Sequence, residues 1–191
     1  MKVDKISDFT NYFSYNSIVI LSFFFICLIV LILNHVFNNK INETFACQRG
    51  SIFNPMTYIR MVTCEFCHDG WSHFRNNFIT ILLIGPMLEE KYGSIHLLEM
   101  ILITTVVTSI IHLIISKKAA IGASDSVFMM ITLASIVNIS NGKIPITLIL
   151  IFMFYVTDEI IKQIGNKKDG ISHDSHIVGA ILGIIFGYFI F

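Results

Sequence analysis

The chain has 191 residues, of which 54% are hydrophobic and 14% are charged, and it has no formal net charge. Because a soluble domain averages about 25% charged residues, this composition and the mean hydropathy of +0.74 indicate an integral membrane protein. The balanced charge excludes the basic surface that nucleic-acid binding needs, so no nucleic-acid partner is expected. The length is typical of one domain.

Six apolar segments follow a short polar segment over residues 1–16. The first, Ser17–Phe37, is long enough to cross a bilayer core of about 30 Å. No small-residue cleavage site follows it, so we interpret it as a retained span and not as a signal peptide. The other five are Phe74–Leu88, Ile95–Ile115, Ser124–Val137, Ile144–Val156 and His176–Phe191.

Several of these segments are shorter than the roughly 20 residues of a standard span. Short helices that begin with polar residues favour a bundle with a protein-lined, water-filled cavity below the membrane surface. We therefore predict an all-α membrane protein in which residues 17–191 form a six-transmembrane-helix bundle. The connection over about residues 38–72 is long for a loop, which predicts internal structure or a function.

The direction of each crossing places three polar segment starts on one face. Because every full crossing reverses direction, the second, fourth and sixth segments begin on the same side of the membrane. Their starts contain the sequences HFRNN, GASDS and SHDSH. We therefore expect six polar side chains at similar depth on one side: His73, Asn77, Ser124, Asp125, His173 and His176.

Ser124 and His176 are the candidate nucleophile and base. A serine hydroxyl needs a base to take its proton, and imidazole is the usual base near neutral pH. Glycines follow His176 at every fourth position and form a stripe along which a neighbouring helix can approach closely; they are Gly179, Gly183 and Gly187.

His73 and Asn77 have i, i+4 spacing, so both project from one face of a helix. Both can donate hydrogen bonds, and fixed donors around a developing oxyanion are the usual partners of a serine nucleophile. Each motif also has a plain structural interpretation. The GASDS sequence suits a helix cap, the glycine stripe suits helix packing, and membrane histidines serve as pairing or proton-relay residues.

Three blocks of the sequence resemble rhomboid intramembrane serine proteases. Residues 68–94, HDGWSHFRNNFITILLIGPMLEEKYGS, resemble the family's second-span block; GASDSVF resembles its G-x-S-G-x-x-F block, and HIVGAILG its H-x-x-G-x-x-x-G block. The blocks occur in family order, and the resemblance covers the chain from Asn54 to its end. It implies a rhomboid-like six-helix fold and peptide-bond hydrolysis within the membrane, by a serine–histidine dyad that needs no metal and no cofactor.

The resemblance also implies a role for each matching residue. Ser124 would be the nucleophile and His176 the base, while His73 and Asn77 would form the oxyanion hole with the Ser124 backbone N–H. Five supporting positions match as well: Gly122 in the turn before the nucleophile, Phe128 against the His176 ring, Arg60 of a first-loop Trp-Arg pair, Glu89 at the inner end of the second span, and His68 of the first loop.

Two positions depart from the family pattern. Asp125 stands where the family has a glycine after the nucleophile, and Ile59 stands where it has the tryptophan before Arg60. A helix dipole favours a negative charge at the helix N-terminus by about 0.3–1 kcal/mol. The Asp125 carboxylate would stabilise a protonated His176 if it faces that ring, and would oppose the oxyanion if it faces the oxyanion hole.

The resemblance implies transmembrane helices as substrates and the lipid bilayer as the environment. Because helical backbone is shielded by its own hydrogen bonds, a substrate helix must unwind locally, and the fifth span with its flanking loops would gate its entry. Two alternatives stay open: a rhomboid-like protein that binds transmembrane clients without cutting them, which Asp125 favours, and a small transporter or channel. The sequence leaves the oligomeric state open.

Three of the four cysteines, at positions 47, 64 and 67, lie in the long first loop. The sequence CEFCH, residues 64–68, has the form of a covalent haem-attachment motif. A disulfide on an oxidising side and a zinc site are further interpretations, but free thiols are the one we prefer. Cys27 lies within the first span and suits a small apolar packing position.

The distribution of basic residues and the family resemblance predict opposite orientations. The face that holds the N-terminus carries four Lys residues, and the opposite face carries nine Lys and Arg residues. The positive-inside rule would place the N-terminus outside. The resemblance to bacterial-type members implies an internal N-terminus, a plasma-membrane location and an active site that opens to the outer face, and we adopt that prediction.

Overall fold

The computed structural model of the protein describes residues 15–137, 144–157, 161 and 173–190. The elements of this part are helical, and the only strand-like pairing in it is an isolated antiparallel bridge between Cys47 and Ala120. The main helices are α2 (Ile18–Val36), α5 (Trp71–Tyr92), α6 (Ser94–Ile115), α7 (Ser124–Ile136), α8 (Ile146–Ile151) and α10 (His173–Ile185). Two π-helical turns, η2 (Phe152–Val156) and η3 (Phe186–Ile190), continue α8 and α10.

The predicted all-α class is confirmed, and helices occur at all six predicted apolar segments. Two helices, α2 and α6, are long and apolar enough to cross a membrane by length and composition; the count of six spans stays a prediction. The helix α5 begins at Trp71, three residues ahead of the predicted start at Phe74. The prediction missed this turn because the polar residues Ser72 and His73 separate Trp71 from the apolar segment. Most of the predicted N-terminal segment and parts of two loops lie outside the described residues.

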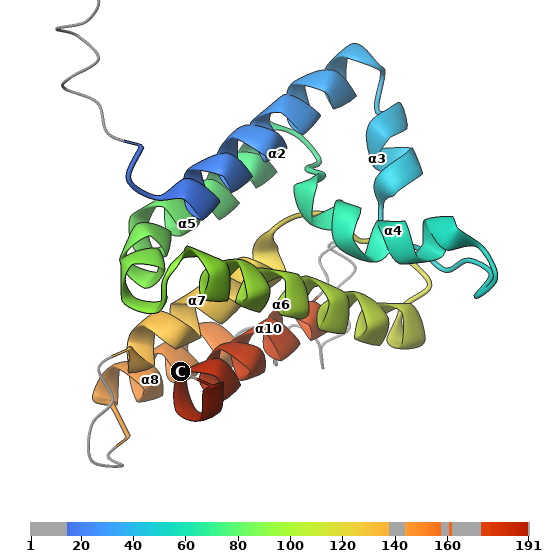
Figure 1. Ribbon diagram of the computed structural model, residues 1–191. Helices are drawn as coiled ribbons and strands as arrows, with labels where there is room; N and C mark the ends of the chain where they lie inside the picture. The colour runs from blue at the N-terminus through green and yellow to red at the C-terminus, as the bar shows by residue number, and fades with distance from the viewer. Residues whose placement is uncertain (1–14, 138–143, 158–160, 162–172, 191) are drawn as a thin grey trace, which may run out of the picture.

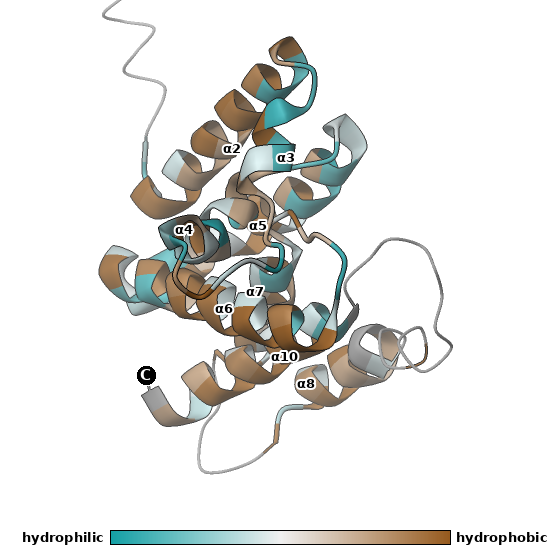
Figure 2. Ribbon diagram, turned by 90° about the vertical axis from the view of Figure 1, so that its right-hand side faces the viewer, coloured by the Kyte–Doolittle hydropathy of each residue, from teal (hydrophilic) through white to brown (hydrophobic). Residues whose placement is uncertain are grey.

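The long connection after α2 contains structure of its own, as its length predicts. It holds α3 (Lys40–Phe45), α4 (Pro55–Thr63) and a short 3-10 turn, η1 (Cys64–Phe66). Asn54 caps α4 by accepting a 3.0 Å hydrogen bond from the backbone N–H of Met56. Figure 1 shows α3 and α4 to one side of the long helices, and Figure 2 shows that α3 is more hydrophilic than α2.

Two arginines hold this connection in place, one by binding the helix bundle and the other by joining two helices of the connection. Arg49 donates to the backbone carbonyl oxygens of Leu113 at 2.8 Å and Ile114 at 2.7 Å, and so satisfies carbonyl groups at the C-terminal end of α6. The Nε of Arg60 donates to the Thr44 carbonyl at 2.7 Å, which joins α4 to α3. The connection is therefore fastened to the helix bundle at one arginine and within itself at the other.

The glycine stripe of α10 packs directly on α7. A Cβ atom on Gly179 would meet the backbone carbonyl of Asp125, and one on Gly183 would meet the backbone carbonyl of Met129. The Thr132 hydroxyl, which also lies against Gly183, donates a 2.9 Å hydrogen bond to the Ala180 carbonyl across the two helices. Because only glycine allows backbones to approach so closely, the stripe fixes the distance between the helix starts that carry Ser124 and His176.

The C-terminal end of α5 is attached to α2 through one carboxylate, that of Glu89. The two oxygens of Glu89 accept hydrogen bonds from the backbone N–H groups of Val19 at 2.9 Å and Ile20 at 3.1 Å, and from the Ser94 hydroxyl at 2.7 Å. Helix N-termini leave unpaired N–H donors and favour negative charge, so Glu89 caps α2 from a neighbouring helix. The hydrophobic core lies between α2, α5, α6 and α7.

Candidate active site

The structure brings Ser124 and His176 together at the start of two adjacent helices. The Nε2 atom of His176 lies 2.9 Å from the Oγ atom of Ser124, although 52 positions separate them in the sequence. Ser124 is the first residue of α7, and His176 lies in the first turn of α10. The His176 side chain is buried.

The ring of His176 is held flat against Phe128. The two ring centroids are 4.5 Å apart and the ring planes differ by 14°. Phe128 lies one turn below Ser124 in α7, so the same helix supplies the hydroxyl and the surface on which the imidazole rests. This stacking leaves the ring little freedom to turn away from Ser124.

The turn before Ser124 lies against His73 and Asn77. Gly122 has a φ angle of +111°, and a Cβ atom there would lie 2.6 Å from Nε2 of His73 and 3.5 Å from Nδ2 of Asn77. Glycine is therefore required by the backbone conformation and by the lack of space. The predicted nucleophile and the two predicted oxyanion donors thus flank the same short turn.

His68 orients the Asn77 amide. Its side chain is fully buried, and Nε2 lies 3.2 Å from Nδ2 of Asn77. Burial, with a smaller effect from the neighbouring His73, lowers the pKa of His68 to about 3, so its ring is neutral at physiological pH. A neutral Nε2 accepts one amide hydrogen of Asn77, and the second amide hydrogen stays available to the site. The first-loop histidine therefore positions Asn77.

Backbone hydrogen bonds from the long first connection hold the segment before Ser124. Cys47 and Ala120 exchange two bonds of 2.9 Å, and the N–H of Gly122 donates to the Cys64 carbonyl at 2.9 Å. This pairing could not be predicted from the sequence, because backbone hydrogen bonds between two irregular segments have no residue pattern. The loop thus contributes to the shape of the site through its main chain.

The Asp125 carboxyl faces α6 and α10. It is within hydrogen-bonding reach of the Thr108 side chain and interacts with the charges of His176, His112 and Asp174. This placement brings the carboxyl close enough to His176 for their charges to interact. A charge there stabilises the imidazolium that forms when His176 accepts a proton.

Two of the predicted supporting residues lie away from the Ser–His pair. Glu89 is at the other end of α5, where it caps α2, and Arg60 binds the Thr44 carbonyl in the first connection. Both make structural contacts in this part of the protein. The His173 side chain lies outside the described residues.

The CEFCH segment does not have the geometry of a haem attachment. Cys64, Cys67 and His68 are all buried, and the His68 Nε2 that would be needed as a ligand is already bound by Asn77. All four cysteines of the chain are free thiols in the structure. Within the described ranges, no group of three or more His, Cys, Asp or Glu side chains is arranged to hold a metal ion.

These features define a helical membrane protein with a serine–histidine pair between two closely packed helices. The family model for the Rhomboid domain matches residues 55–191. The chain therefore belongs to the Rhomboid family, whose members are integral membrane proteins.

Three relatives from the comparison are distant in sequence and longer than this chain. Rhomboid-related protein 1 of Caenorhabditis elegans is 29% identical over 139 residues, which cover 68% of this chain and 39% of the relative. RHOMBOID-like protein 5 of Arabidopsis thaliana is 22% identical over 139 residues, which cover 68% of this chain and 43% of the relative. RHOMBOID-like protein 4 of the same plant is 27% identical over 135 residues, which cover 68% of this chain and 33% of the relative. The chain thus matches less than half the length of each of these relatives.

Proposed function

We propose that the protein is an intramembrane serine endopeptidase that cleaves transmembrane helices with a Ser124–His176 dyad. The observation that carries the proposal is the 2.9 Å separation of the His176 Nε2 and Ser124 Oγ atoms. Membership of the Rhomboid family and the two polar side chains beside Gly122 support it.

The geometry suggests a route for each proton. Neutral His176 accepts the Ser124 hydroxyl proton as Oγ attacks the carbonyl carbon of a substrate peptide bond. The negative oxygen of the tetrahedral intermediate is stabilised by the Asn77 amide, the Ser124 backbone N–H and His73. His176 then protonates the departing amine, and a water molecule, activated in the same way, hydrolyses the acyl-serine ester.

The proposed substrates are transmembrane segments that unwind near the cut site. A helical peptide bond has its carbonyl engaged in the helix, so small and helix-destabilising residues are expected there. We further propose that the region of α8 gates substrate entry and that the site opens to the outer face of a bacterial-type plasma membrane, with the N-terminus inside. The family resemblance supports these proposals.

Asp125 favours a second candidate, a rhomboid-like protein that binds transmembrane clients without cleaving them. Its carboxyl stands beside the nucleophile and interacts with His176. A charge that holds the imidazole protonated would remove the base that Ser124 needs. The same charge would assist catalysis if the imidazole starts neutral, so reactivity has to be measured.

A fluorophosphonate probe on purified protein in detergent separates these candidates. Wild type is compared with Ser124→Ala, His176→Ala and Asp125→Gly. We expect wild type to be labelled and the first two variants to be unlabelled, since the probe needs an activated serine. Labelling of Asp125→Gly without labelling of wild type would favour the non-cleaving candidate. Folded protein that is unlabelled in every variant would contradict the dyad.

Cleavage itself is tested with a transmembrane helix bearing a fluorophore and a quencher, reconstituted with the protein in liposomes. We expect the helix to be cleaved in liposomes that contain wild type and to stay intact in liposomes that contain Ser124→Ala. Ion or solute flux that survives in Ser124→Ala but is lost in His73 or His176 variants would instead indicate a transporter or channel.

A further inference from the structure

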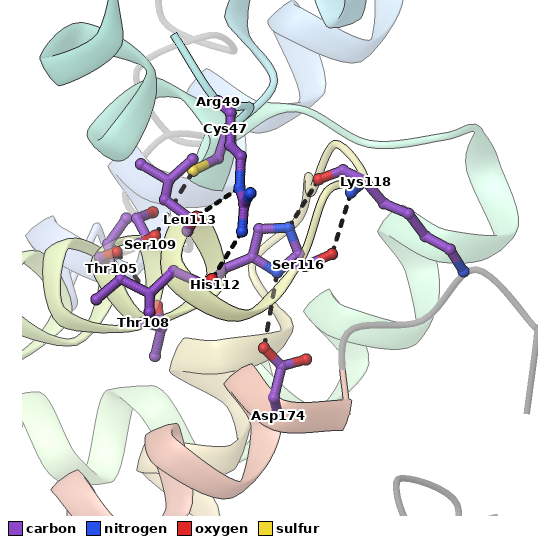
Figure 3. A network of polar contacts seen from close by, with 11 residues as sticks. Cys47, Arg49, Thr105, Thr108, Ser109, His112, Leu113, Ser116, Lys118 and Asp174 are labelled. Atoms are coloured by element: carbon purple, nitrogen blue, oxygen red, sulfur yellow. Dashed lines mark hydrogen bonds and ion pairs between the residues drawn. The ribbon is translucent and has the colours of Figure 1, made fainter. Parts of the chain in front are cut away.

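His112 joins three segments that surround the Ser–His pair. It lies near the end of α6 and is 4% exposed. Its Nε2 atom is 3.0 Å from the Lys118 carbonyl, in the connection that leads to Ser124. Its Nδ1 atom is 3.8 Å from an Asp174 carboxylate oxygen, in the first turn of α10. Figure 3 shows the ring between these two partners, with the side chain of Lys118 extending away from it.

This arrangement determines where the hydrogens of the His112 ring must be. A carbonyl oxygen can only accept, so the short contact with Lys118 places a hydrogen on Nε2. A neutral imidazole then has a lone pair on Nδ1, and that lone pair faces the Asp174 carboxylate. Two acceptors do not attract each other. One further proton, on Nδ1 or on the carboxyl group, is therefore needed for His112 and Asp174 to hold together.

We propose that His112 and Asp174 form a one-proton latch that positions the first turn of α10, and with it His176, opposite Ser124. The latch is closed while the pair keeps its proton and opens when the proton is lost at alkaline pH. Its effect on Ser124 reactivity rests on the proposed function, but its existence does not. His112 and Asp174 are positioning residues here, since they act through the placement of His176.

The charged neighbours favour retention of the proton. From α7, the Asp125 carboxyl interacts with His112, Asp174 and His176. From the first connection, the Cys47 thiol faces His112, and the buried Glu65 carboxyl faces Asp125. Burial of His112 opposes a positive charge on its ring, whereas the charges of Asp125 and Cys47 favour one. His176 of α10 interacts with Asp125 and with His73 of α5.

The latch acts on the alkaline side of the pH profile. Attack by Ser124 requires a neutral imidazole on His176. The latch is present at low pH and is lost as pH rises, so reactivity falls on the alkaline side. A single released proton gives an alkaline limb that falls about tenfold per pH unit.

Asp174→Asn is the decisive variant, because an amide replaces a proton-dependent link by a proton-independent one. The Asn NH₂ group can donate to the lone pair on Nδ1 of neutral His112. We measure fluorophosphonate labelling rates from about pH 5.5 to about pH 10 and correct for hydrolysis of the probe. We expect the alkaline limb in wild type, its loss in Asp174→Asn, and weak labelling at every pH in His112→Gln.

His96→Gln is the matched control. His96 and Glu99 form a second histidine–carboxylate pair on α6, at 3.1 Å, but their side chains are 52% and 55% exposed. This variant is expected to keep the alkaline limb of wild type. An alkaline limb that persists unchanged in Asp174→Asn, or that disappears in His96→Gln, would overturn the latch.

A second readout does not depend on catalysis. Thermal unfolding is followed over the same pH range with Ser124→Ala as the parent. We expect the unfolding temperature to fall more steeply with rising pH in the parent than in the parent that also carries Asp174→Asn. Equal pH dependence of the two would reject the latch. Absence of labelling at any pH would count against the proposed function, and this unfolding comparison would still decide between a latch and no latch.

Discussion

The two ends of α5 both bury polar side chains, but they use them differently. At one end, Glu89 accepts three hydrogen bonds, from Val19, Ile20 and Ser94, and both of its oxygens are engaged within the protein. At the other end, Asn77 uses one amide hydrogen on His68 and keeps the second directed to the site. The first arrangement is complete by itself, and the second has donor capacity left for a ligand.

This difference separates stability from reactivity along a single helix. A buried group whose bonds are all internal contributes through the cost of leaving its partners unpaired. A donor that is held in place but not fully used contributes when a charge develops near it. Substitutions at the two ends should therefore affect different measurements.

The largest effect is expected for Asn77→Ala on the reaction with the fluorophosphonate probe. Loss of one oxyanion-hole donor typically reduces the rate by about 10²- to 10³-fold. The free energy of unfolding should fall by about 1–3 kcal/mol, the cost of leaving the buried His68 Nε2 without its partner. The control is Asn76→Ala, because Asn76 is the exposed neighbour on the same helix. An equal loss of rate in both variants would show that Asn77 acts only through the packing of α5.

Glu89→Ala should give the next largest effect, and on stability. Its removal leaves the Val19 and Ile20 N–H groups and the Ser94 hydroxyl without this acceptor. The Ile20 bond is buried, and the Val19 and Ser94 bonds are part-buried and cost less because water can reach these groups. One unpaired buried group costs about 1–3 kcal/mol, so with the two smaller losses we expect the free energy of unfolding to fall by about 2–4 kcal/mol. Equilibrium unfolding in mixed micelles measures it, and Glu90→Ala is the exposed control.

The comparison fails if Glu89→Ala lowers the labelling rate of the folded fraction as strongly as Asn77→Ala does. That result would mean that the two ends of α5 are coupled through the helix, and that Glu89 has a role in reactivity as well as in the attachment of α2.

The sequence could predict these two ends to different degrees. Apolar periodicity located α2, α6 and α7 within a residue or two, and alternation of crossing direction placed Ser124, His73 and Asn77 on one face. Motif resemblance assigned Glu89 to the inner end of α5 but not its hydrogen-bond partners. Two of these partners are backbone N–H groups of α2, and any sequence that forms a helix supplies such groups.

Other contacts of the site could not be predicted because no periodic signal encodes them. The bridge between Cys47 and Ala120 is made by main-chain atoms. The His112–Asp174 pair joins a helix end to a helix start 62 positions away along the chain, and both residues also suit an ordinary helix terminus. Such pairings depend on the final packing of α6 against α10.

The smallest effect concerns a second buried glutamate, which sharpens the comparison with Glu89. Glu65 is 2% exposed, and among the described residues its Oε1 atom has no hydrogen-bond partner. Burial, and next the charge of Asp125, raise the pKa of Glu65 to about 8 from an ordinary value of 4.5. A raised pKa means that the folded protein keeps a proton that the unfolded chain releases.

The stabilisation from that proton is fully present below pH 4.5 and is lost as pH rises through about 8. Between about pH 6 and pH 7 the free energy of unfolding should fall by about 1 kcal/mol more in wild type than in Glu65→Gln, because the amide has no proton to lose. Unfolding at these two pH values measures it, with the exposed Glu43→Gln as control. Identical pH dependence in wild type and Glu65→Gln would show that Glu65 is ionised in the folded protein. The side chains of Ser126 and Thr105, which are within hydrogen-bonding reach of Glu65, would then hold its charge as the partners of Glu89 do.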